Sequence, residues 1–149
     1  MTRTSIVVLL LVTISTFWVA EQSWADASCS KDDALLAEQE AASLTEWRTV
    51  YGSYVKYHQC DDGSIAEGYS ESVSMILADR WPQIDDLAKM IQKDKNFRPF
   101  VLRHLDESVP SGRLRIIESN ARNQCPQKHR ALCDLILRSI PRLPSNRPS

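Results

Sequence analysis

The sequence contains little glycine and few of the alternating patterns that build β-sheets. There are four glycines in 149 residues, and runs that alternate valine, isoleucine or threonine with polar residues are rare. Strands and hairpins depend on such runs and on turn residues, so their scarcity argues against a β-sheet protein. Apolar residues recur instead at spacings of three and four, which predicts amphipathic helices.

The common fingerprints of nucleotide-binding, hydrolytic and zinc sites are also missing. The chain has no P-loop, G-x-G-x-x-G, G-x-S-x-G, H-E-x-x-H or C-x-x-C. Basic and acidic residues number 18 and 19, so the basic excess of a nucleic-acid binder is missing too. We expect a protein that is not an enzyme, holds no cofactor or metal, and has no nucleic-acid partner.

The first 27 residues have the layout of a cleaved secretory signal. Arg3 precedes the apolar run 6–14, and residues 25–27 form an A-x-A cleavage site. The apolar stretch breaks at Glu21 and falls short of the about 20 residues that span a bilayer. We expect a signal peptide at 1–27, a mature form without a membrane span, and a periplasmic or secreted location in a Gram-negative bacterium.

Capping patterns and apolar stripes predict an all-α domain at 28–140, followed by a disordered Pro/Ser/Arg-rich tail at 141–149. Ser30, Ser43 and Ser64 each stand three residues before an acidic residue, as N-cap residues do. We expect a compact bundle or array of five to seven short helices, with stripes at 32–42, 47–58, 65–81, 84–91, 97–105, 114–123 and 126–140. Within 47–58, Trp47 and Tyr51 should be buried, whereas Tyr57 lies off the stripe and should be exposed.

The four cysteines lie beyond the predicted cleavage site, and an even number in an exported protein indicates two disulfides. They are Cys29, Cys60, Cys125 and Cys133. A regular helix opened by Pro126 would place the α-carbons of Cys125 and Cys133 about 12 Å apart, beyond the about 7 Å that a disulfide allows. We therefore expect Cys29 and Cys60 each to pair with a C-terminal cysteine, although a later helix start would reverse this.

The stretch HQCDDGSIAEGYSES, residues 58–72, is the densest in polar side chains. Its pattern fits a turn through Gly63 followed by a helix that Ser64 and Glu67 cap. As a calcium loop it lacks most of the required ligands. The surface residues that we expect to contact a partner at this corner are Asp61, Asp62, Glu71 and Tyr57.

The order of the segments resembles the small exported helical immunity proteins that neutralise type VI secretion amidase effectors in the Gram-negative periplasm. The resemblance rests on the signal peptide, on "CDDGSIAEGYSES" after the first helices, on "FRPFVLRHLD", and on a helix running into "NARNQCP". It spans 60–126, and the chain is also similar to bacterial periplasmic proteins of no assigned role. The resemblance implies a protein that acts by binding another protein.

Three functions therefore remain open from the sequence. The first is protein binding, including immunity-type inhibition of a periplasmic effector or contact with another envelope protein. The second is a small cell-wall or sugar hydrolase, because glycoside hydrolysis uses paired carboxylates and Asp62, Glu67 and Glu71 lie close in sequence. The third is a structural or stress protein.

Overall fold

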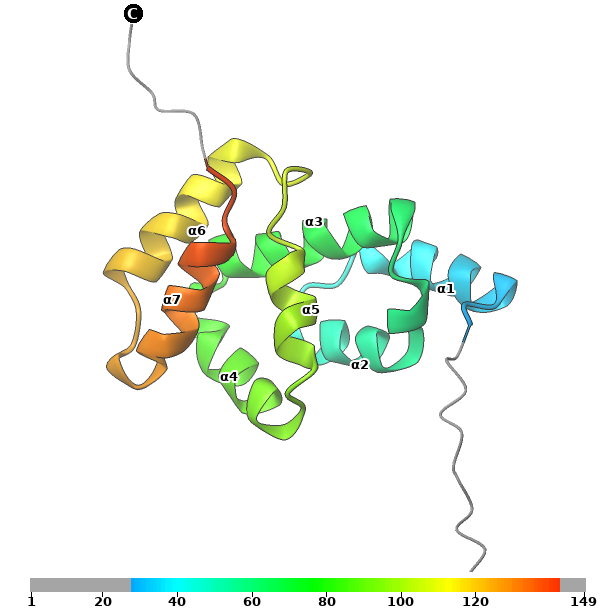
Figure 1. The fold of residues 1–149 in the computed structure, drawn as a ribbon, viewed down its shortest axis with the longest axis horizontal. Coiled ribbons are helices and arrows are strands. Elements are labelled where there is room, and N and C mark those ends of the chain that lie inside the picture. Colours follow the sequence, from blue (N-terminus) through cyan, green and yellow to red (C-terminus); the bar gives the residue numbers. More distant parts are fainter. Residues whose placement is uncertain (1–27, 143–149) are drawn as a thin grey trace, which may run out of the picture.

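The computed structural model describes residues 28–142, and these residues fold as an array of helices (Figure 1). Within this range there is no strand, which confirms the all-α class. The seven α-helices are α1 (Lys31–Ala41), α2 (Trp47–Tyr57), α3 (Gly63–Asp79), α4 (Ile84–Lys93), α5 (Phe97–Arg103), α6 (Ser111–Asn123) and α7 (Arg130–Ser139). Short 3-10 helices occupy His58–Cys60, Trp81–Gln83 and Gln127–His129. The predicted signal peptide and residues 143–149 of the predicted tail lie outside the described residues.

The long helix α3 runs through the middle of the array, with α1 packed near one end and α6 near the other (Figure 1). Small side chains on α3 allow close contact with α1. The buried Ser72 hydroxyl donates a hydrogen bond to the carbonyl of Ala41 at 2.6 Å and accepts one from the amide of Leu44 at 3.0 Å. At the other end, the Asn120 side-chain amide donates to the carbonyls of Leu77 and Ala78. These bonds satisfy backbone groups that helix ends leave unpaired.

Gly68 marks the closest approach between α3 and α1 and supplies a first prediction. A Cβ at this position would lie 2.9 Å from the Cβ of Ala41 and 3.1 Å from the backbone nitrogen of Ala42. Gly68→Ala should therefore lower the free energy of unfolding by about 1–3 kcal/mol, as overpacking does. Gly52→Ala is the matched control, because a Cβ there would meet nothing within 4 Å and alanine favours a helix by about 0.5–1 kcal/mol. Urea unfolding should give a lower free energy of unfolding for Gly68→Ala and a higher one for Gly52→Ala. A Gly68→Ala protein as stable as wild type would contradict the close packing of α3 against α1.

The centre of the core is a cluster of aromatic rings from α2, α3 and α5. The Phe100 ring lies 4.6–5.8 Å from the rings of Tyr54, Tyr69, Phe97 and His104. Such pairs add to the stability that burial itself provides. The cluster fixes α5 against α2 and α3.

Trp47 is 2 % exposed, as predicted, and Tyr51 is half-buried. The expectation that Tyr57 is exposed is wrong, because its side chain is only 9 % exposed. Helix α2 is contacted by α1, α3 and α4. Its buried face is therefore wider than a single stripe.

The capping predictions hold at one of three places. Ser30 caps α1, since its hydroxyl accepts a hydrogen bond from the amide of Asp33 at 3.1 Å. The prediction for Ser43 is wrong, because its hydroxyl donates back to the carbonyl of Glu40 at the end of α1. The prediction for Ser64 is wrong because Asp62 is the N-cap of α3, and its carboxylate accepts from the amide of Gly63 at 2.8 Å.

The disulfides are Cys29–Cys60 and Cys125–Cys133, so the predicted pairing of N-terminal with C-terminal cysteines is wrong. The prediction assumed a regular helix from Pro126. Pro126 instead has an extended backbone, a 3-10 turn follows it, and α7 begins only at Arg130. This irregular start leaves the α-carbons of Cys125 and Cys133 6.3 Å apart. The prediction that a helix ends before Pro141 is confirmed by the end of α7 at Ser139.

Disulfides of this kind are typical of proteins that fold in an oxidising compartment. Cys29–Cys60 ties the segment before α1 to the corner between α2 and α3, and its α-carbons are 4.8 Å apart. Among residues 28–142, no helix combines the length and the apolar character that a bilayer crossing requires.

Candidate functional site

The corner between α2 and α3 contains the acidic residues that the sequence singled out. The side chain of Asp61 is 2 % exposed and its carboxylate accepts a hydrogen bond from the Arg103 guanidinium on α5. The Nε2 atom of His104 lies 3.3 Å from the same carboxylate. Burial raises the pKa of Asp61, but the donors and positive charge of His104 and Arg103 outweigh it and hold the pKa below its usual value. Asp61 therefore joins the corner before α3 to α5.

His104 continues this buried polar chain into α3. Its Nδ1 lies 3.2 Å from the hydroxyl of Ser70, which donates in turn to the Asp106 carboxylate at 3.2 Å. The order Asp61, His104, Ser70 resembles a hydrolytic triad in residue type. Ser70 is 1 % exposed and His104 is 2 % exposed, so neither presents an atom to a substrate in this conformation. His104 is a buried core residue that is hydrogen-bonded to Ser70.

The carboxylates proposed for a hydrolase occupy separate positions on and before α3. Asp62 caps the helix, and Glu71 pairs with Arg113 of α6 at 2.5 Å. Glu67 is exposed. None of the three lines either of the two hollows described below. Across residues 28–142 no group of three or more His, Cys, Asp or Glu side chains is placed to hold a metal ion.

The four expected partner contacts differ in how much surface they offer. Tyr57 is 9 % exposed and the Asp61 side chain 2 % exposed, so both contribute to the interior of the corner. Asp62 is exposed, and the Glu71 side chain is 44 % exposed. Only Asp62 and Glu71 keep a surface from which to contact a partner, and their role in binding stays a prediction.

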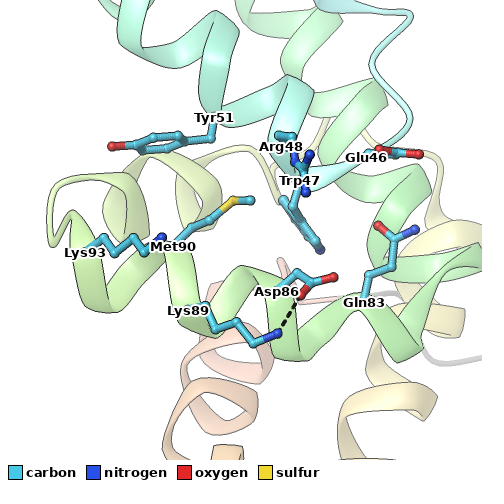
Figure 2. A pocket seen from close by; sticks show the side chains of 9 residues that line it. All are labelled: Glu46, Trp47, Arg48, Tyr51, Gln83, Asp86, Lys89, Met90 and Lys93. Carbon is cyan, nitrogen blue, oxygen red and sulfur yellow. Dashed lines mark hydrogen bonds and ion pairs between the residues drawn. The ribbon is translucent and has the colours of Figure 1, made fainter.

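A groove lies between α2 and α4 on the described surface. It encloses about 690 Å³, which is within the usual range for a ligand pocket. Figure 2 shows the side chains that line it, and they are Glu46, Trp47, Arg48 and Tyr51 on the α2 side and Gln83, Asp86, Lys89, Met90 and Lys93 on the α4 side. We call this feature the α2–α4 groove. The second hollow, of about 520 Å³, is more open and lies between α5 and the end of α7.

The floor of the α2–α4 groove is apolar. The Trp47 ring projects into its middle, and Met90 lies beside it, below the Tyr51 ring (Figure 2). Tyr51 is held in place by an edge-to-face contact with Phe97 at 5.0 Å and by its hydroxyl, which lies 3.4 Å from the Asp94 carboxylate. Methionine adapts its shape to what it contacts. The floor therefore combines two positioned aromatic rings with one flexible side chain.

The charged residues around this floor do not balance one another. Lys89 pairs with Asp86 at 2.9 Å across one side of the groove. Arg48 and Lys93 are exposed, and neither has an ion-pair partner among residues 28–142. Glu46 lies at the opposite end of the groove from Lys93 (Figure 2). The lining thus carries two unpaired positive charges against one negative charge.

The Tyr51 phenol lies at the Lys93 end of the groove (Figure 2). Burial, followed by the negative charge and hydrogen bond of Asp94, raises the pKa of this phenol above its ordinary value. The hydroxyl is therefore protonated at neutral pH. It donates its one proton to the Asp94 carboxylate, 3.4 Å away.

The sequence-based analysis missed this groove. Its residues come from two segments that are distant in the chain, and Arg48, Lys89 and Lys93 resemble ordinary surface charges in the sequence. The one signal was Tyr51, which was assigned to the core and is only half-buried.

Comparisons with known proteins do not assign this chain to a family or to a known fold. No protein-family model, no curated protein and no solved structure matches this chain. The evidence for function is therefore the groove and the helices that form it.

Proposed function

We propose that this protein acts without catalysis, by binding another protein through the α2–α4 groove in the periplasm or outside the cell. The observation that supports the proposal is the pair of half-buried apolar side chains, Tyr51 and Met90, beside the buried Trp47. They are bordered by Arg48 and Lys93, which are exposed and have no ion-pair partner among the described residues. Aromatic residues, methionine and arginine are the side chains enriched at protein interfaces. The two disulfides suit an oxidising compartment.

The finer form of this proposal is immunity-type inhibition. In that case the partner is a cell-wall amidase delivered to the periplasm, and binding blocks its action. The resemblance in segment order between 60 and 126 supports this reading. The rigid presentation of the groove by α2 and α4 supports it too, because a pre-organised surface loses less entropy on binding.

Site-specific photo-crosslinking in cells tests the binding surface. A photoreactive phenylalanine analogue at Lys89 or Gln83 should give one shared adduct when the full chain is exported to the periplasm of a Gram-negative host. The same analogue at the exposed Gln39 on α1 is the control and should give no such adduct. Adding Met90→Glu should abolish the adduct without unfolding the protein, since Met90 is half-buried at the groove. An adduct that survives Met90→Glu, or none from the groove, would count against this surface.

The inhibitory form is tested by protection. Cells that receive periplasmic amidase effectors should survive when they export the wild-type protein and lyse when they export the Met90→Glu variant. If cells that export either protein lyse while a groove-dependent adduct is still present, the protein binds a partner through the groove but that partner is not the amidase.

A further inference from the structure

We infer that the segment bound in the α2–α4 groove carries an acidic residue beside an apolar one. This inference rests on the proposed function, and it specifies the partner's chemistry. The apolar side chain would lie against the half-buried Tyr51 and Met90, beside the buried Trp47. The carboxylate would lie between Arg48 and Lys93.

Charge complementarity is the first argument for this chemistry. Of the five charged side chains that line the groove, Asp86 and Lys89 neutralise each other at 2.9 Å. Lys93 carries its positive charge at the end where Tyr51 and Met90 lie, Arg48 lies beside Trp47 in the middle, and Glu46 is at the far end (Figure 2). Potentials of opposite sign attract a partner and fix its register. A neutral or basic segment would leave these two cations unpaired.

The side chains themselves give the second argument. The Arg48 guanidinium can donate two parallel hydrogen bonds to one carboxylate. The groove volume of about 690 Å³ accommodates a few residues of an extended segment. Met90 can adjust to the shape of several apolar side chains. The groove therefore selects for an acidic residue more strictly than for one particular apolar residue.

The experiment selects binders from a random twelve-residue peptide library displayed on phage, against the oxidised full-length protein. Selected sequences should be enriched in Asp or Glu next to Leu, Ile, Phe or Met. Their binding should weaken as NaCl is raised from 50 to 500 mM, since salt screens exposed charges. The double variant Arg48→Glu/Lys93→Glu should weaken the selected peptides by about 10-fold or more, because attraction becomes repulsion at two positions.

Lys31→Glu is the matched control. It reverses an exposed cation at the start of α1, outside the groove, and should leave binding unchanged. Circular dichroism and urea unfolding establish that both variant proteins keep the wild-type fold. The inference is overturned if no sequence is selected, if the selected sequences are neutral or basic, or if the double variant binds them as wild type does. If any of these results is obtained together with a groove-dependent crosslink, protein binding through the groove is still supported and only the acidic partner segment is rejected.

Discussion

Asp61→Asn should lower the free energy of unfolding by about 3 kcal/mol at neutral pH. The substitution removes one charge from a buried pair and leaves the buried His104 and the Arg103 guanidinium without their anion. Breaking such pairs typically costs about 3–5 kcal/mol, and we take the lower end because the Arg103 side chain is 53 % exposed. Urea unfolding at pH 7 measures the effect.

The same variant should change how stability depends on pH. The pKa of Asp61 is lower in the folded state than in the unfolded chain, so its contribution is complete above about pH 4, the unfolded pKa. The contribution is lost as the pH falls through the folded pKa. The difference between wild type and Asp61→Asn should therefore narrow as the pH falls below about 4.

Asp62→Asn is the control for this prediction. It removes one negative charge from the next residue, but asparagine caps a helix about as well as aspartate, so stability should change little. Two results would contradict the ionic link between Asp61 and α5. One is an equal loss of unfolding free energy from the two substitutions. The other is a difference in stability between wild type and Asp61→Asn that stays constant as the pH falls.

Removing the Cys29–Cys60 disulfide should destabilise the protein more than removing Cys125–Cys133. The bonds close segments with sequence separations of 31 and 8. The chain-entropy relation gives costs of about 4 kcal/mol and about 2.5 kcal/mol for these lengths. Urea unfolding of Cys29→Ala/Cys60→Ala and Cys125→Ala/Cys133→Ala compares the two, with peptide mapping of the wild type to establish the pairs. A larger loss from the C-terminal pair, or cross-pairing of N- and C-terminal cysteines, would contradict the arrangement.

Features that depend on neighbours in the chain could be predicted from the sequence. The helix at 32–42 follows from its helix-forming residues, and the helix at 97–105 follows from its apolar stripe. Ser30 caps α1, and the last helix ends before Pro141 as proline requires. Each of these depends on contacts within a few residues. Local propensity and periodicity are sufficient to fix them.

Features that depend on tertiary partners could not be predicted in the same way. The pattern Ser64-x-x-Glu67 matches a capping box, yet the Ser64 hydroxyl donates to Glu38 of α1 at 2.7 Å. Tyr57 lies off the main stripe of α2 but is buried because several helices cover α2. The Cys125–Cys133 bond depends on the backbone after Pro126, where a 3-10 turn replaces an α-helical one.

The corner at residues 58–72 has a structural role, which its polar composition alone does not predict. Gly63 has a φ of +52°, a backbone conformation that favours glycine. Cys60 fixes the corner to the segment before α1, and Asp61 ties it to α5. We therefore locate the candidate binding surface at the α2–α4 groove, where Arg48 and Lys93 are exposed and have no ion-pair partner among the described residues.

Hydrogen–deuterium exchange of the protein, alone and with the partner identified by crosslinking, tests the central claim most directly. Bound partner should slow exchange of backbone amides at 46–52 and 83–93, because it covers the two helix faces that form the groove and suppresses their local opening. Exchange in α1 and at the corner 58–72 should stay as it is in the protein alone. Protection at 58–72 with none at 83–93 would contradict the α2–α4 groove as the binding surface.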